Sequence, residues 1–408
     1  MAGKNLPNIG ILILGISIHA ALFGTNYAQT QFEIDQSVIY DENVFRNYLE
    51  IPDWITQTTA FISHSIPINN SQLRSRYSGN INTFNDFKDR LFHIHDLGFS
   101  AVMPIYESLA LHAGTSFQIR KNQTEYNIYD YANWLLNGDL IFNKWRSSFF
   151  QIGYHFRKKD FQNLPQFNFE ENFVYLRTRL FLPTRTTILG QVNMATKNYT
   201  ENQTIEELII TDKVKPHQGT GQGRRRGDVP IVSDTAIVAN NLSIPETQQW
   251  SLQIKLAQSV FRTTGASLDY IRRFEPTQGT RYLSGQEYAY TKDDELFDDP
   301  FTYASHEWYF TVTQILPGDF TLKLNASLAD KQYIYSAQTD SLVQSGIVEK
   351  RKDTQFYLGF SLDKNFSLSW FIHEMNIYFS YFYLINESND PYFDSRGKMI
   401  SFGTSFKL

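Results

Sequence analysis

The chain has no cysteine among its 408 residues. Disulfide bridges and thiolate metal sites are therefore excluded, and so is the cysteine acceptor through which a bacterial lipoprotein carries its lipid anchor. Long apolar runs are scarce too, because the mean hydropathy is −0.36 and a helical membrane span needs about 20 consecutive apolar residues. Neither a lipid anchor nor a bundle of membrane helices is expected.

Charge of one sign is also lacking, because 37 Lys and Arg stand against 42 Asp and Glu and give a net charge of −5 at pH 7. This balance gives no reason to expect nucleic-acid binding. The chain is instead rich in aromatic residues, with 24 Tyr and 33 Phe, and these favour β-strands. The composition indicates a strand-rich protein whose apolar residues are spread along the chain.

The first 28 residues have the pattern of a secretory signal peptide. Lys4 supplies the positive charge, an apolar stretch runs from Ile9 to Phe23, and Ala28 precedes the expected cut. An uncleaved membrane anchor is the alternative, but this stretch is shorter than a span and contains His19. We predict a signal peptide at 1–28, export from the cytoplasm, and a mature domain at 29–408.

Sixteen segments of the mature chain alternate apolar with polar residues, and the gaps between them are alternately short and long. This rhythm is typical of outer-membrane barrels, in which tight periplasmic turns alternate with longer external loops. A soluble β-sandwich or propeller also alternates but does not require the rhythm. We predict an all-β fold, a transmembrane antiparallel up-and-down β-barrel of about 16 strands, with 14 as the alternative. The predicted strands are 31–40, 54–67, 72–84, 90–103, 108–120, 131–142, 146–157, 171–182, 185–196, 248–260, 264–275, 304–316, 320–335, 351–364, 369–385 and 398–408.

The tryptophans are placed as a membrane protein would place them. Trp54, Trp134, Trp250 and Trp308 fall near strand ends that the gap rhythm assigns to the outside, whereas Trp145 and Trp370 fall near periplasmic ends. Amphipathic rings suit the headgroup regions at both membrane interfaces. The six residues therefore support the predicted orientation of the strands.

The first predicted hairpin resembles a known family. The run from Tyr40 to Arg46 reads Tyr-Asp-Glu-Asn-Val-Phe-Arg, and Pro-Asp-Trp-Ile follows at 52–55. It is similar to the first hairpin of uncharacterised Gram-negative outer-membrane barrels of the β-barrel porin type, which often carry D-D-N-x-F/Y-R there. Glu42 departs from that pattern. The resemblance implies a barrel fold and assigns no functional residue.

The last hairpin, from Ser388 to Phe406, resembles those porins and also the barrels of surface lipoprotein assembly modifiers. The lipoprotein-assembly relatives usually carry a periplasmic helical-repeat domain before the barrel, which is not found here. The final strand is also similar to the C-terminal signal by which outer-membrane proteins are inserted. We expect Phe402 and Phe406, on the lipid-facing side of the alternation, to form that signal for the barrel assembly machinery; the alternative is that they only face lipid.

The sequence offers only weak candidates for a catalytic or metal-binding site. Ser305 and His306 are adjacent on a predicted strand and so point to opposite faces. This argues against their acting as a nucleophile and its base. His93 and His95 share a face, but without a third ligand we interpret them as a solvated pair in the lumen rather than a zinc site. One loop is rich in carboxylates, and we interpret it as solvated rather than as a calcium site: Asp293, Asp294, Glu295, Asp298 and Asp299. No enzyme, no catalytic, cofactor-binding or metal residue and no cofactor is predicted.

The longest predicted external loop is 197–247, and it contains Gly219, Gly221, Gly223 and the run Arg224 to Asp228. The glycines do not fit a phosphate-binding loop, since G-x-x-x-x-G-K-[ST] is absent. Three roles stay open: contact with anionic lipopolysaccharide, constriction of a pore, and adhesion through Arg-Gly-Asp. The alternative is a flexible solvated loop.

A barrel of about 16 strands is wide enough for an aqueous lumen. The leading hypothesis is an outer-membrane channel for small solutes, in a Gram-negative bacterium, surrounded by lipid and lipopolysaccharide. The alternatives are a non-conducting scaffold or surface-binding protein, and an export channel that works with periplasmic partners. The polar face carries charges predicted to line the lumen, with arginines on one wall and carboxylates on part of the other: Arg74, Arg76, Arg120, Arg157, Arg177, Arg179, Asp269, Glu307 and Asp363.

Overall fold

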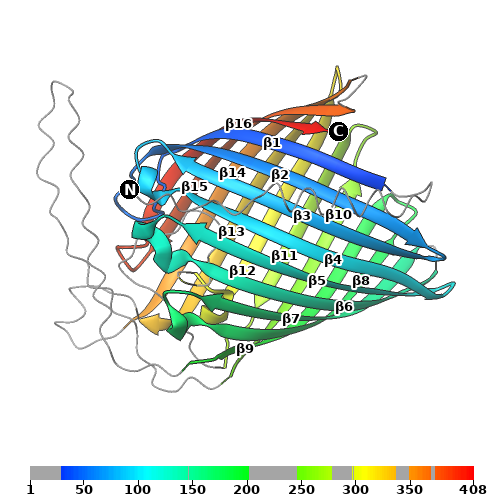
Figure 1. The fold of residues 1–408 in the computed structure, drawn as a ribbon, viewed down its shortest axis with the longest axis horizontal. Coiled ribbons are helices and arrows are strands. Elements are labelled where there is room, and N and C mark those ends of the chain that lie inside the picture. The colour runs from blue at the N-terminus through cyan, green and yellow to red at the C-terminus, as the bar shows by residue number, and fades with distance from the viewer. Residues whose placement is uncertain are drawn as a thin grey trace, which may run out of the picture.

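The computed structural model describes residues 29–145, 147–201, 246–277, 296, 298–336, 349–368 and 373–408. The predicted signal peptide at 1–28 and most of the predicted loop at 197–247 lie outside the described residues. The described chain forms one closed barrel of 16 antiparallel strands (Figure 1). The predicted fold is confirmed, and the alternative of 14 strands is wrong.

Each strand pairs with its neighbours in the sequence, and β1 pairs with β16 to close the wall. At this seam Glu33 lies opposite Lys407, and Asp41 lies opposite Met399. Closure leaves no unpaired sheet edge, which is what a wall surrounded by lipid requires. The strands are β1 (Gln29–Asp41), β2 (Asp53–Ile68), β3 (Ser71–Phe84), β4 (Phe92–Tyr106), β5 (Leu109–Asn122), β6 (Tyr131–Trp145), β7 (Ser148–Phe161), β8 (Phe169–Phe181), β9 (Thr186–Tyr199), β10 (Thr247–Ser259), β11 (Thr264–Arg273), β12 (Tyr303–Leu316), β13 (Phe320–Ser336), β14 (Lys350–Ser367), β15 (Glu374–Ser388) and β16 (Ser395–Lys407).

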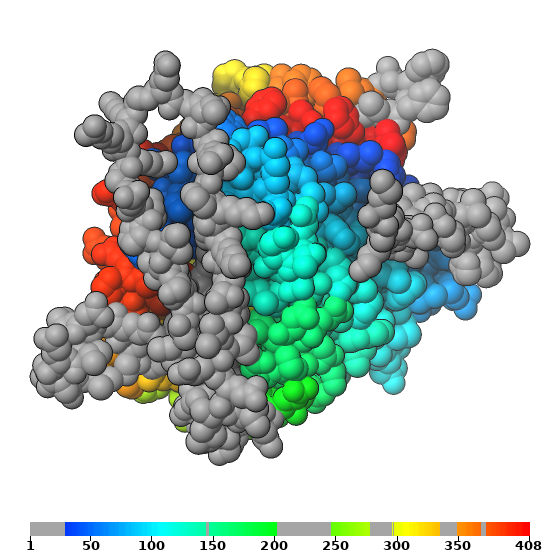
Figure 2. Space-filling model, turned by 60° about the vertical axis from the view of Figure 1, so that its left-hand side comes forward, coloured from blue at the N-terminus to red at the C-terminus, as the bar shows by residue number. Residues whose placement is uncertain are grey.

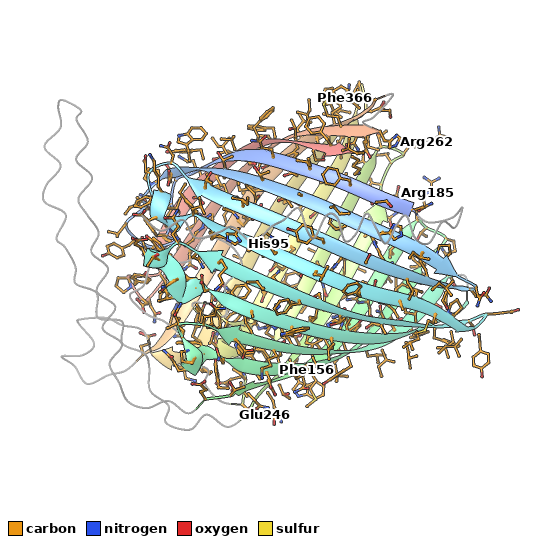
Figure 3. The ribbon with its side chains drawn as sticks, in the orientation of Figure 1. His95, Phe156, Arg185, Glu246, Arg262 and Phe366 are labelled. Atoms are coloured by element: carbon orange, nitrogen blue, oxygen red, sulfur yellow. The ribbon has the colours of Figure 1, made fainter. Side chains whose placement is uncertain are left out.

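The two ends of the barrel differ, as the gap rhythm predicts. Short turns gather at one end, where Arg185, Arg262 and Phe366 project in Figure 3, and we call it the turn end. The longer connections gather at the other end, the loop end, and four short 3-10 helices lie in them (Figure 1). These helices are η1 (Lys88–Arg90), η2 (Thr124–Tyr129), η3 (Pro165–Phe167) and η4 (Pro300–Thr302).

Tight turns at the turn end use backbone conformations with positive φ. Gly318 and Asp319, between β12 and β13, have φ of 78° and 59°, and Asn69, between β2 and β3, has φ of 53°. Glycine, asparagine and aspartate are the residues that adopt this region most readily. The turn chemistry that the sequence supplies at these positions therefore fits the hairpins it makes.

Strand boundaries differ from the prediction by up to five residues, at both ends of the barrel. β15 begins at Glu374 rather than at 369, and β6 continues through Trp145, which was predicted to lie in a turn. The β6–β7 register shifts between Phe142 and Trp145, so an irregularity lets the strand continue past polar Asn143. Polar residues do not end a strand when the neighbouring strand still offers hydrogen bonds.

The outer face of the wall is apolar. Figure 2 shows strands from β1 to β9 lying side by side, in bands from blue to green. Phe99, Leu176 and Phe402 on this face are 54%, 55% and 55% exposed. Large exposed apolar side chains over a whole wall are expected only where lipid covers them.

Four tryptophans lie on this outer face near the loop end, as predicted: Trp54, Trp134, Trp250 and Trp308 are between 44% and 54% exposed. Trp134 packs on Phe117 with 4.3 Å between ring centroids, and Trp308 packs on Tyr270 at 4.4 Å. They form an aromatic girdle of the kind that marks a membrane interface. Of the predicted periplasmic tryptophans, Trp370 lies outside the described residues.

The connections at the loop end fold inward and give the barrel small hydrophobic cores. One core joins η2 and η3 to strands β6, β7 and β8, and Leu296, from the β11–β12 connection, is fully buried in it. The second core joins the β1–β2 connection, with Val44 and Phe45, to Phe84 and Phe92. These cores narrow the loop end of the barrel from within. Among the described residues, no helix is long and apolar enough to span a membrane.

Candidate functional site: the inner wall

The inner wall is defined by the alternation of side chains along each strand, because paired residues point to the same face of a sheet. Arg177 on β8 pairs with Gln151 on β7 and with Gln191 on β9, and its neighbours Leu176 and Thr178 point outward. The register places the nine charged residues predicted from the sequence on this same inward face. They are Arg74, Arg76, Arg120, Arg157, Arg177, Arg179, Asp269, Glu307 and Asp363.

Three of these arginines have no carboxylate partner among the described residues. Arg74 donates to the Ser63 hydroxyl over 3.3 Å. Arg177 donates to Gln191 over 2.6 Å, and the Arg179 guanidinium lies 4.7 Å from the Phe149 ring. Their positive charge is therefore not neutralised within the described wall, and it is available to an anion in the lumen.

The other three arginines are paired with carboxylates or buried. Arg76 forms an ion pair with Asp96 at 3.5 Å, and its side chain is 50% exposed. Arg157 pairs with Glu171 and lies over Phe169. Arg120 is only 2% exposed, with its guanidinium 4.0 Å from the centre of the Phe92 ring. Arg120 therefore packs into the wall and is not accessible to a solute.

Asp269 lies on the far side of the barrel from β3, since β11 is eight strands away in a closed ring of 16, whereas Glu307 lies on β12 and Asp363 on β14. Asp269 accepts two hydrogen bonds from Gln253, of 3.0 and 2.8 Å. Glu307 is 4% exposed and pairs with Arg273 at 2.9 Å, so its charge is neutralised locally. Asp363 pairs in register with Tyr378. Lys255 and Lys323 lie on the same inward face as these carboxylates, and Glu307 does not contribute a free charge.

A ring of buried cations at the loop end was not predicted. We call these residues, together with the aromatic rings they lie against, the cation–aromatic belt. Each cation is at most 6% exposed, and each lies within 5 Å of the centre of an aromatic ring. A desolvated cation over a ring gains about 2 kcal/mol. The six cations are Arg90, Arg120, Lys159, Lys197, Lys331 and Arg351.

Lys197 shows how the belt holds an inward-folded connection. Its ammonium lies 3.9 Å from the centre of the Phe169 ring and forms an ion pair with Asp299, and both side chains are 1% exposed. Asp298, the residue before, pairs with Lys331 and accepts from Tyr333. The expectation of a solvated acidic loop is therefore wrong for Asp298 and Asp299, because their carboxylates anchor the β11–β12 connection to β9 and β13.

Arg351 is a belt cation that two aromatic rings enclose. It is 2% exposed, forms an ion pair with Asp353, and lies 3.3 Å from the centre of the Phe393 ring and 4.0 Å from that of Tyr333. Phe393 belongs to the β15–β16 connection, so this cation fixes a second loop. One sequence signal could have indicated the belt, since Lys-x-aromatic recurs where β7, β9 and β13 end: Lys159-x-Phe161, Lys197-x-Tyr199 and Lys331-x-Tyr333.

The motif of the first hairpin has a structural explanation. Asp41 accepts hydrogen bonds from the Asn43 backbone and, over 3.2 and 2.7 Å, from the Arg46 guanidinium. Asn43 donates to the carbonyls of Asn47 and Arg396, which ties the loop to β16. These bonds turn the chain so that Val44 and Phe45 enter the core. The motif therefore builds the inward fold of the first loop.

The candidate zinc ligands and the candidate nucleophile and base form neither a metal site nor a catalytic site. His93 and His95 share the outer face with Phe99, so the expectation of a solvated lumen pair is wrong. His95, labelled in Figure 3, forms a hydrogen bond through its Nδ1 atom with the Tyr77 hydroxyl at 2.8 Å. The register explains this placement. Phe92 pairs with Asn82 on the inward face, so the alternate residues His93 and His95 lie on the outward face. Ser305 points inward and donates to Glu307, whereas His306 points outward, as their adjacency predicts. In the part of the chain that the structure describes, no three potential metal ligands gather.

The residues of the predicted insertion signal lie on the outer face. Phe402 is 55% exposed, and Phe406 follows two positions later on β16, opposite Ile34 of β1. Lys407 points inward and pairs with Glu374 at 2.9 Å. The position of the two rings fits contact with lipid and leaves their role as a signal a prediction.

Comparison with known proteins relates the chain to other barrels by fold alone. No known family matches its sequence, and no curated protein does. The structure of OccK8 (OprE) from Pseudomonas aeruginosa is similar with a TM-score of 0.50 and 8% identity, over 94% of this chain and 98% of that one. OccAB1 from Acinetobacter baumannii is similar with a TM-score of 0.51 and 8% identity, over 94% and 97% of the two chains.

Proposed function

We propose that this protein is an outer-membrane channel through which small solutes diffuse. A wall of 16 strands encloses a lumen wide enough for water. The observation that carries the proposal is the inner wall on β3 and β8, where Arg74, Arg177 and Arg179 have no carboxylate partner in the described chain. Charges held without partners are stable only where water reaches them.

The proposal includes the cellular setting. The apolar outer face and its girdle of tryptophans support placement in the outer membrane of a Gram-negative bacterium, after removal of the signal peptide. The turn end then faces the periplasm and the loop end faces outside. Lipid and lipopolysaccharide surround the wall, and the barrel assembly machinery inserts it. No catalytic role is proposed, because Ser305 and His306 point to opposite faces.

A second candidate is a non-conducting scaffold, and one observation favours it. The inward-folded connections at the loop end are held by buried ion pairs such as Lys197 with Asp299, and they pack fully buried side chains inside the barrel. If they met across the barrel, the lumen would be shut. The protein would then serve as an outer-membrane anchor for its external loops.

Single-channel recording decides between the two. We expect the purified protein to produce discrete current steps after insertion into a planar bilayer, because water fills the lumen that the wall encloses. Insertion without current, with insertion itself verified by resistance of the barrel to protease in vesicles, would contradict the channel and support the scaffold.

A further inference from the structure

A buried carboxylate with two histidines lies in the inner wall between β5 and β8. Asp139 on β6 is 5% exposed. The Nδ1 atom of His112 is 3.2 Å from its Oδ2, and the Nε2 atom of His155 is 3.8 Å from its Oδ1. Tyr175 donates its hydroxyl to the same Oδ1 over 2.6 Å. Three neighbouring strands thus bring their polar groups to one carboxylate, and we call these four residues the Asp139 cluster.

A glycine makes this arrangement possible. Gly153 on β7 pairs in register with Asp139 on one side and with Tyr175 on the other. A Cβ atom at Gly153 would lie 2.2 Å from Asp139 Oδ1 and 2.3 Å from Tyr175 Cε1. A larger side chain fits there only if Asp139 and Tyr175 move apart. The hydrogen bond between Tyr175 and Asp139 crosses the space that the glycine leaves.

The histidines form the exposed surface of the cluster. The side chains of His112 and His155 are 34% and 35% exposed, whereas Asp139 and Tyr175 lie beneath them at 5% and 4%. Protons can therefore pass between the imidazoles and water in the lumen. Histidine is the side chain that ordinarily changes charge between about pH 5 and 8.

The other charges that face the cluster are few. Arg177, next on the inward face of β8, lies with its guanidinium 5.2 Å from the Tyr175 ring. Arg157, next to His155 on β7, is neutralised by Glu171 on β8. The β9 residues that face the cluster, Gln191 and Asn193, are uncharged, and so is Val102, which pairs with His112 from β4. Among the described residues that face the cluster, His112 and His155 are the only histidines.

We infer that the Asp139 cluster is a selectivity site of the channel whose sign is set by protons. With both histidines neutral, the charge of the cluster is that of the one carboxylate. With both protonated, two positive charges outweigh it, and the cluster becomes a surface that attracts anions. The cluster then disfavours anions in alkaline solution and favours them in acid, beside the fixed charge of Arg177. This inference rests on the proposed channel.

The test measures reversal potentials in a gradient of KCl at pH 8 and pH 5. We expect the permeability of chloride relative to potassium to rise at least about twofold between pH 8 and pH 5 in the wild type. The double variant His112→Gln/His155→Gln should lose most of this rise, and each single variant should lose part of it. The matched control is His95→Gln/His306→Gln, which removes two histidines from the outer face and should keep the full rise.

A further variant tests the carboxylate. Asp139→Asn keeps the shape of the side chain and removes the negative charge, so we expect a higher chloride preference than wild type already at pH 8. A current whose reversal potential changes with pH equally in the wild type and in the double variant would overturn the inference and leave the channel intact. Absence of current at both pH values would overturn the channel, and the inference with it.

Discussion

At the scale of single residues, the buried cations of the loop end carry a large desolvation cost. The Lys197 ammonium is buried, and Asp299 and the Phe169 ring stabilise it in place of water. Removing one partner of such a pair leaves an uncompensated buried charge, which costs about 3–5 kcal/mol. An exposed pair is worth less than about 1 kcal/mol.

The variant Asp299→Asn tests this difference. We expect it to lower the free energy of unfolding by about 3 kcal/mol, because it removes the negative charge that pairs with the buried Lys197 ammonium. Urea unfolding of the barrel in lipid vesicles measures the change. The control Glu349→Gln removes an exposed ion pair with Lys352 and should change the same quantity by less than about 0.5 kcal/mol. Equal effects of the two variants would contradict the assigned burial.

The unpaired arginines of the inner wall make a second prediction. The variant Arg177→Ala/Arg179→Ala removes two positive charges from one side of the lumen. If the lumen conducts, we expect the permeability of cations relative to anions to rise at least about twofold at pH 7. Reversal potentials measure it. Arg396→Ala, on the outer face and 68% exposed in its side chain, should leave the ratio unchanged.

At the scale of elements, the strands could be predicted from sequence and the inward loops could not. Alternation with a period of two is a local property, so it indicates each strand and also the face on which Arg177 or Asp269 lies. The partners of Lys197 and Arg351 come from connections distant in sequence, and no local pattern encodes them. His93 and His95 were misplaced because polar side chains were expected to face the lumen, whereas the alternation of β4 puts them on the outer face with Leu97 and Phe99.

The last strand gives a prediction at this scale. Phe406→Asp places a carboxylate on the outer face near the turn end, where the direct cost of a charge is only about 0–1 kcal/mol. That cost is too small to prevent insertion, so strongly reduced amounts in the outer membrane would report loss of the insertion signal. Immunoblots of membrane fractions measure it. Lys407→Ala, which removes a partly exposed ion pair, should be nearly neutral, and normal amounts of both variants would remove the signal assignment.

At the scale of the whole molecule, the orientation of the barrel can be tested without background, because the chain contains no cysteine. Lys88→Cys lies in η1 at the loop end, and Thr184→Cys lies in an exposed turn at the turn end. On intact cells a membrane-impermeant maleimide should label the first variant and spare the second. Both should react once the outer membrane is opened. The reverse pattern would invert the orientation.

The seam between β1 and β16 has a consequence for timing. Glu33 and Lys407 meet across it although about 370 positions separate them, and joining ends so far apart costs about 5 kcal/mol of chain entropy. The first strand to be synthesised therefore finds its second partner only after the final strand exists. The polypeptide must be kept from aggregating for that whole interval, with sixteen half-apolar strands exposed. Because the wall closes only through its last strand, the precursor depends on a chaperone until that strand has been made.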